Sequence, residues 1–140
     1  MNEHTWNDCL ETNTTTTITP DIAKTRSLID TANGRIDYLR ETPTNEKNAN
    51  YLFEGYYSSA LELLHALLTK QGYKVANHIC LGLYIRDTLN DQNLFRIFDD
   101  CRYKRNALIY YGKKMDYDTA QQAIQKTKTL IQKITKHLTT

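Results

Sequence analysis

The strongest helical pattern of this chain lies in the stretch YLFEGYYSSALELLHALL, residues 51–68. Its apolar and aromatic residues recur every three or four positions, which is the spacing of one face of an α-helix. The stripe consists of Phe53, Tyr56, Tyr57, Ala60, Leu64, Leu67 and Leu68. Gly72 follows the stripe, and glycine commonly ends a helix. The sequence therefore predicts a long helix over residues 47–71 with a wide face to bury.

Helical patterns of the same kind lie on both sides of this stretch. Thr19 and Pro20 suit the start of a helix that ends before a break at residues 41–48. Further helices are predicted over residues 75–89 and 92–111, and from Asp116 or Asp118 onward. No segment shows the sustained alternation of a strand with hairpin turns. The chain is therefore expected to be all-α, an antiparallel bundle of four or five helices with short loops.

Residues 1–17 are predicted to form a disordered, Thr-rich tail. The segment TNTTTTIT, residues 12–19, is polar and lacks an amphipathic pattern. Residues 18–140 then form a single helical domain, since 140 residues is an ordinary length for one domain.

The three cysteines, Cys9, Cys80 and Cys101, stand far apart. An odd number at wide spacings is not typical of a disulfide framework, so we expect reduced thiols in a cytoplasmic protein. The first 20 residues lack the basic and apolar regions of a secretory signal. No stretch has the roughly 18 apolar residues of a membrane span, so no membrane partner is expected.

Charge is unevenly distributed, although the net charge of the chain is only +2. Residues 102–140 carry nine Lys or Arg against Asp116 and Asp118, a net of +7, which leaves −5 for residues 1–101. A basic C-terminal third can attract nucleic acid. The alternative is that the lysines of the last helix form its solvated face.

The basic part begins with RYKRNALIYYG, residues 102–112. On a helix, Leu94, Phe98, Cys101 and Leu108 form the apolar face, and Arg105 falls inside it. A charge in that position needs a partner, because burying it alone costs several kcal/mol.

Three arrangements satisfy Arg105. It pairs with an acid inside the bundle, such as Asp37, Glu54 or Glu62; it lies at an interface between subunits; or it lines a cleft that binds an anion. The planar guanidinium suits phosphate in the last case. Arg102 has a local partner, since Asp99 lies three residues before it on the same face.

The segment RNALIY, residues 105–110, resembles the HEPN superfamily motif Arg-Asn-x-x-x-His. Arg105 and Asn106 match, and Tyr110 stands in place of the His. The stretch GYYSSALELLHALLTKQGYKVANH, residues 55–78, is similar to the helix-turn region of small HEPN proteins, and DTAQQAIQKTKTLIQKI is similar to their last helix. The resemblance covers roughly residues 20–138 and implies a HEPN-like helical bundle for the domain.

The resemblance also implies a function. HEPN domains typically dimerise through the motif helix, many are metal-independent RNases, and many are toxins encoded beside a minimal nucleotidyltransferase antitoxin. It implies a homodimer, RNA or a nucleotide as ligand, a nucleotidyltransferase partner, no cofactor and no metal. The implied binding residues are Arg102, Tyr103, Lys104 and Arg105, and the implied catalytic residues are Arg105, Asn106 and Tyr110.

Tyr110 is the main departure from the family. Attack of a 2′-hydroxyl on phosphorus needs a proton acceptor, and cations for the charge that develops. A tyrosine phenol, with a reference pKa of about 10, is a poor base near neutrality, so we expect weakened catalysis. The alternative is a non-catalytic HEPN dimer that serves as a nucleotide-binding or interaction module. Gly112 stands where toxins silenced by nucleotidyl transfer carry the modified Tyr, so that mechanism is not carried over.

The histidines carry weaker signals. His78 and Cys80 lack the second ligand pair of a metal site, and His78 is expected to cap a helix or to be hydrogen-bonded. His65 is expected to be a partly buried structural residue.

Overall fold

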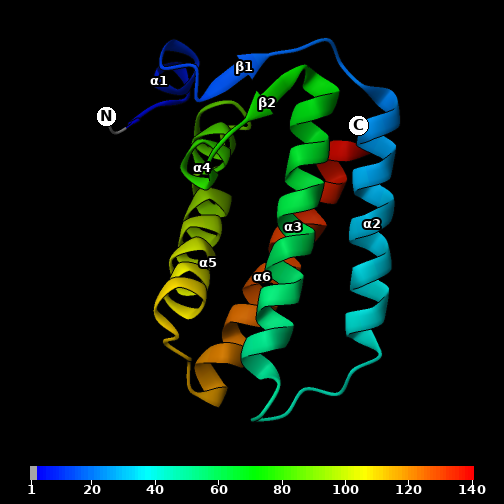
Figure 1. Ribbon diagram of the computed structural model, residues 1–140, viewed down its shortest axis with the longest axis vertical. Helices are drawn as coiled ribbons and strands as arrows, with labels where there is room; N and C mark the ends of the chain where they lie inside the picture. The colour runs from blue at the N-terminus through cyan, green and yellow to red at the C-terminus, as the bar shows by residue number, and fades with distance from the viewer. Residues whose placement is uncertain (1–2) are drawn as a thin grey trace.

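The computed structural model describes residues 3–140, so residues 1 and 2 of the predicted tail lie outside it. Within this range the chain forms six helices and two short strands (Figure 1). They are α1 (Trp6–Glu11), β1 (Thr15–Thr17), α2 (Ile22–Arg40), α3 (Ala49–Gln71), β2 (Tyr73–Val75), α4 (His78–Asp87), α5 (Gln92–Tyr111) and α6 (Tyr117–Leu138). The predicted helical bundle is confirmed, but residues 3–140 form six helices in place of four or five, and two short strands that the sequence did not predict.

The four long helices alternate in direction along the long axis of the molecule (Figure 1). α3 lies at the centre and packs against both α2 and α6, and α5 packs against α6. The short helix α4 lies with the two strands and α1 at the end of the bundle where α3 ends. α4 also packs against α5, which places its first residues beside the predicted site.

The core forms around the stripe of α3 that the sequence identifies. Every residue of that stripe, from Phe53 to Leu68, is at most 3% exposed. Burial of each large apolar side chain stabilises the fold by roughly 1.5–3 kcal/mol. The helix ends at Gly72, which adopts the left-handed conformation with φ 88°, as predicted.

Aspartate side chains cap the starts of two of the long helices, α2 and α6. Asp116 accepts from the backbone N–H of Thr119 at 2.8 Å and caps α6, as predicted. α2 starts later than predicted, because its cap is Asp21, which accepts from the N–H of Lys24 at 3.0 Å. Thr19 and Pro20 therefore precede the helix and do not open it.

The N-terminal segment forms α1 and β1, where the sequence suggested a disordered tail. Thr5 and Asp8 form a capping box at the start of α1. Trp6 is buried and packs edge-on against Tyr73 and Tyr84, with ring centroids 5.3 and 5.1 Å away. β1 pairs with β2 in an antiparallel register, and threonine favours strands because it is β-branched.

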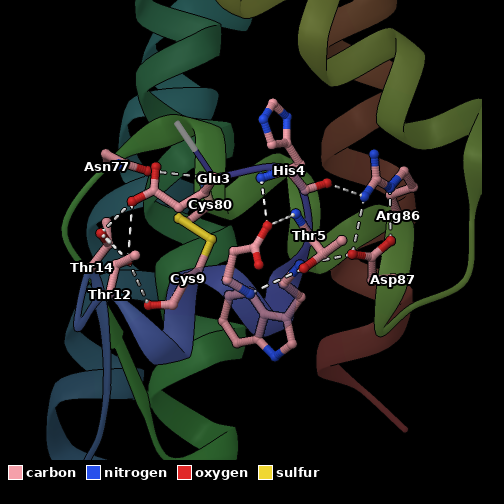
Figure 2. The surroundings of a disulfide bond; sticks show 12 residues. Glu3, His4, Thr5, Cys9, Thr12, Thr14, Asn77, Cys80, Arg86 and Asp87 are labelled. Atoms are coloured by element: carbon pink, nitrogen blue, oxygen red, sulfur yellow. Dashed lines mark hydrogen bonds and ion pairs between the residues drawn. A yellow bond between two sulfur atoms is a disulfide. The ribbon is translucent and has the colours of Figure 1, made fainter. Parts of the chain in front are cut away.

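A disulfide joins Cys9 of α1 to Cys80 of α4 (Figure 2). The expectation of three reduced thiols is therefore wrong for this pair, and Cys101 is the free cysteine. The pair is 71 residues apart in sequence, but the folding of α1 onto α4 brings the Cα atoms to 6.0 Å. Trp6 adds a second link between α1 and α4, since its backbone N–H donates to the carboxylate of Asp87 at 2.8 Å.

The segment predicted as one helix over residues 75–89 begins as β2. α4 starts only after Asn77, whose side chain accepts from the N–H of Cys80 at 2.8 Å. Strand pairing to β1 holds residues 73–75 extended until that cap. No helix among residues 3–140 is long and apolar enough to cross a membrane.

Candidate functional site

The apolar face of α5 lies as predicted. Leu94, Phe98, Cys101 and Leu108 are buried. Arg105 is half-buried on the same face and reaches Tyr57 of α3. Its position in the stripe therefore places a charged side chain at the edge of the core.

The guanidinium of Arg105 contacts two tyrosine rings. Its carbon is 5.9 Å from the ring centroid of Tyr57 and 5.8 Å from that of Tyr110, which is the range of cation–π contacts. Its Nε is buried without a hydrogen-bond partner. Within residues 3–140, no carboxylate forms an ion pair with it. The described chain thus leaves the charge of Arg105 unpaired.

The three acids suggested as internal partners of Arg105 are engaged elsewhere, so that alternative is wrong for each of them. Glu62 pairs with Arg35, Glu54 accepts a hydrogen bond from Ser58, and Asp37 pairs with Arg40. All three lie on α2 or α3 and bind neighbours on those two helices. The interface and the anion-binding arrangements remain.

Arg102 and Lys104 are paired with acids of their own helix. Arg102 donates from Nε and Nη2 to one oxygen of Asp99, at 3.1 and 2.9 Å, which is the local pair that the sequence suggested. Lys104 donates to Asp100 at 2.9 Å, and Lys126 of α6 donates to the same oxygen at 3.0 Å. Partial burial raises the pKa of Asp100, but the hydrogen bonds from both lysines outweigh this and hold that pKa below its ordinary value. Lys104 therefore helps to join α5 to α6.

A cavity of about 330 Å³ opens between the start of α4 and the second half of α5. Arg102, Asn106 and Tyr110 line it from α5, and His78 lines it from the facing segment, residues 76–79. We call it the His78 cavity. It brings three of the predicted site residues together with a histidine that the α5 motif does not contain, but Arg105 itself is not among its lining residues.

The imidazole of His78 is held by a buried tyrosine. Its Nδ1 is 3.3 Å from the hydroxyl of Tyr57. Burial lowers the pKa of His78, and the neighbouring Arg105, His65 and Arg102 lower it further. Burial raises the pKa of Tyr57 well above its ordinary value. Near pH 7 the pair is therefore a neutral imidazole hydrogen-bonded to a protonated phenol.

The sequence analysis expected His78 to cap a helix or to be hydrogen-bonded, and the second expectation is confirmed. Asn77 provides the cap instead. No motif connects His78 with the α5 segment. Only the packing of α4 on α5 reveals that they share a cavity.

A second cavity, of about 650 Å³, shares Asn106 and Tyr110 with the first. We call it the tyrosine cavity. Its lining is aromatic and basic and includes Tyr103, Lys104, Tyr110, Tyr111, Lys113 and Lys114. Tyr103, Tyr110 and Tyr111 are 73%, 68% and 83% exposed. Exposed rings beside cations offer stacking surfaces for nucleic-acid bases.

Comparison with protein-family models, curated proteins and solved structures finds no match to this chain. The resemblance to HEPN domains stays a prediction from the residues quoted above. No group of three or more His, Cys, Asp or Glu in residues 3–140 is placed to hold a metal ion.

Proposed function

We propose that this protein binds single-stranded RNA on the α5 surface and cleaves it as a HEPN-like, metal-independent endoribonuclease. One observation carries the proposal. Arg105 is a half-buried arginine without an acid partner among residues 3–140, and its neighbours on α5 line two adjoining cavities.

The unpaired charge of Arg105 favours an anion. A cation at the edge of a core normally binds a carboxylate, because partial burial weakens its hydration. Two aromatic rings stabilise the guanidinium here without neutralising it. A phosphate group has the charge and the geometry that its planar donors bind best.

The two cavities suit a nucleotide chain more than an isolated phosphate. A phosphate in the His78 cavity would meet Arg102 and Asn106. The adjacent base would then lie in the tyrosine cavity, among exposed rings and lysines. Asn106 and Tyr110 line both cavities, so a chain that crosses them joins the two subsites.

The proposed enzyme is a homodimer through α5, as the HEPN resemblance implies. Exposed apolar side chains on the C-terminal half of α5 support this, since Ile109 is 47% exposed and lies beside Tyr110 and Tyr111. Facing copies of α5 would bring two sets of Arg102 and Arg105 to one RNA strand.

The second candidate is a non-catalytic HEPN dimer that binds a nucleotide or a nucleotidyltransferase. The observation that favours it is Tyr110, which occupies the motif His position and presents a mostly exposed ring. An exposed tyrosine ring stacks on a nucleobase more readily than it accepts a proton.

Incubation of the purified protein with mixed-sequence single-stranded RNA in EDTA tests the proposal. Wild type should cleave the RNA and Arg105→Ala should not. The matched control is Arg96→Ala, which removes an exposed arginine from the same helix and should leave cleavage unchanged. Fluorescence anisotropy with the same RNA measures binding separately.

The outcomes separate the candidates. RNA that is bound but stays intact at high protein concentration supports the non-catalytic module. No binding at low salt refutes RNA as the ligand, and the second candidate is then tested with a nucleotide. If circular dichroism shows that Arg105→Ala is unfolded, Arg105→Lys replaces it, because lysine keeps the charge and loses the planar donor geometry.

A further inference from the structure

We propose that His78 of α4 accepts the proton of the attacking 2′-hydroxyl, the role that Tyr110 does not fill. The inference rests on the proposed RNA cleavage. His78 is not part of the α5 motif, because it precedes Arg105 by 27 positions in the sequence. It reaches the site only through the packing of α4 on α5.

His78 faces the predicted site residues of α5 across one cavity. It lines the same cavity as Arg102, Asn106 and Tyr110. A phosphate held by the α5 residues would therefore have the imidazole on the facing wall. A base for 2′-hydroxyl attack has to lie within hydrogen-bond reach of the sugar next to that phosphate.

The bond to Tyr57 leaves one ring nitrogen available. Nδ1 faces the Tyr57 hydroxyl at 3.3 Å, and Nε2 has no hydrogen-bond partner within residues 3–140. When Nδ1 carries the ring proton and donates a hydrogen bond to the Tyr57 oxygen, the lone pair of Nε2 is free to accept a proton from a substrate. A hydrogen bond at one ring nitrogen commonly sets the tautomer at the other.

The charges around His78 favour its neutral form. Tyr57 and His65 face it from α3, and Arg102, Arg105 and Tyr110 lie on the α5 side. Burial and the two arginines lower its pKa from 6.5. Arg102 is offset in part by Asp99, its ion-pair partner. A neutral imidazole near pH 7 is ready to accept a proton.

The first turn of α4 is anchored from both sides. Asn77 caps it, and Cys80 is bound to Cys9 of α1 (Figure 2). His78 lies between these two anchors in the sequence. These two contacts fix the backbone that carries the imidazole, as a reacting group requires.

The proposed step balances as a transesterification. Nε2 of His78 takes the proton of the 2′-hydroxyl, and the 2′-oxygen forms a bond to phosphorus. The bond from phosphorus to the 5′-oxygen breaks, and that oxygen keeps the electron pair and takes a proton from water. Arg102, which lines the cavity, and Arg105, whose charge acts on His78, neutralise the charge that develops on the phosphate. The products are a 2′,3′-cyclic phosphate and a 5′-hydroxyl, and the imidazolium returns its proton to solvent.

The test measures RNA binding and single-turnover cleavage in EDTA for wild type and His78→Gln. The variant should lose cleavage by about 10²–10⁴-fold, the usual contribution of a general base, and should bind RNA as wild type does. The wild-type rate should rise with pH through a midpoint below 6.5, and the variant should lack this rise. Added imidazole should partly restore cleavage by His78→Ala, which a structural role would not allow.

The matched control is His137→Gln. His137 lies in the last turn of α6 and does not line the His78 cavity, so its replacement should leave cleavage unchanged. Cleavage by His78→Gln at the wild-type rate overturns the inference. So does a folded His78→Gln protein that no longer binds RNA, or a wild type that binds RNA without cleaving it. A wild type that binds no RNA instead refutes the proposed function itself.

Discussion

Arg105 of α5 lies over the ring of Tyr57 of α3, with 5.9 Å between the guanidinium carbon and the ring centroid. Tyr57 is completely buried, and its hydroxyl lies 3.3 Å from Nδ1 of His78. One core tyrosine therefore contacts both the unpaired cation and the histidine of the His78 cavity. A cation–π contact positions the guanidinium while leaving its charge available to a ligand.

The salt dependence of RNA binding should reveal whether Arg105 contacts phosphate. The association constant for RNA falls as the salt concentration rises, and a log–log plot of the two has a negative slope. Arg105→Ala should make this slope shallower by about 1, because one phosphate contact is lost. Arg96→Ala should keep the wild-type slope, since Arg96 is an exposed arginine at the other end of α5. Anisotropy titrations at several salt concentrations provide the slopes. Identical slopes for wild type and Arg105→Ala would exclude a phosphate contact.

The tyrosine cavity should contribute stacking energy. Tyr103→Ala and Tyr111→Ala should each weaken RNA binding by about 1–3 kcal/mol, the usual effect of removing an aromatic ring that stacks on a base. Both rings are largely exposed, so the fold should be unaffected. Tyr38→Ala is the control, because Tyr38 is equally exposed, at 71%, but lies on α2. Equal affinities for all three variants would contradict the stacking role.

The oligomeric state should depend on the exposed face of α5. Ile109→Lys should shift the protein from dimer to monomer in sedimentation velocity, because the substitution introduces a charge into the proposed interface. Ile22→Lys provides the control, since Ile22 is 68% exposed at the start of α2. A monomeric wild type would refute the proposed dimer, and the cavities of a single chain would then form the whole site.

The disulfide should contribute strongly to stability. Cys9→Ala combined with Cys80→Ala should lower the free energy of unfolding by about 2–5 kcal/mol, because the crosslink restricts the unfolded chain over a long loop. Chemical denaturation with and without reductant measures the loss. Reductant should destabilise wild type and Cys101→Ala, and should have no effect on the double variant. Alkylation of denatured, unreduced protein should modify one thiol, and modification of all three would show that the bond does not form.

Stability should fall as the pH drops below 6.5. The folded pKa values of His65 and His78 lie below the ordinary value of 6.5, mainly because both rings are buried. The unfolded state therefore gains protons first as the pH falls, so the stabilisation is complete above 6.5 and is lost toward the lowered pKa values. The pKa of Asp87 is lowered from its ordinary value of 3.8, mainly by the hydrogen bond from Arg86. Asp87 therefore affects stability at a lower pH than the two histidines do.

Denaturation curves at several pH values test this dependence. The double variant His65→Gln, His78→Gln should lose less stability than wild type between pH 6.5 and the lowered pKa values. The loss of stability at lower pH that comes from Asp87 should remain. A wild type with constant stability across the upper window would show that neither imidazole is held neutral by the fold.

Several elements could be predicted because their causes are local. The stripe from Phe53 to Leu68 has helical spacing, and it forms the centre of the core. Gly72 and Gly112 end helices in the left-handed conformation, and Asp116 caps α6 through the N–H of Thr119, three residues away. Each of these features depends on residues within a few positions of one another.

The N-terminal part could not be predicted in the same way. Thr15 alone shows no strand pattern, and its extended conformation follows from pairing with Val75. Cys9 has no local signal for a bond to Cys80, because the two meet only after α1 has packed on α4. Contacts across such distances in sequence are decided by the whole core.

Helical periodicity alone places Arg105 on the apolar face of α5. Periodicity also predicted the long helices and the buried stripes of α3 and α5. Packing between helices brings Arg105 to Tyr57 and to no carboxylate among residues 3–140, and it brings His78 into one cavity with Asn106. Those contacts join different helices, and a helix's own period does not specify the side chains that a neighbouring helix presents to it.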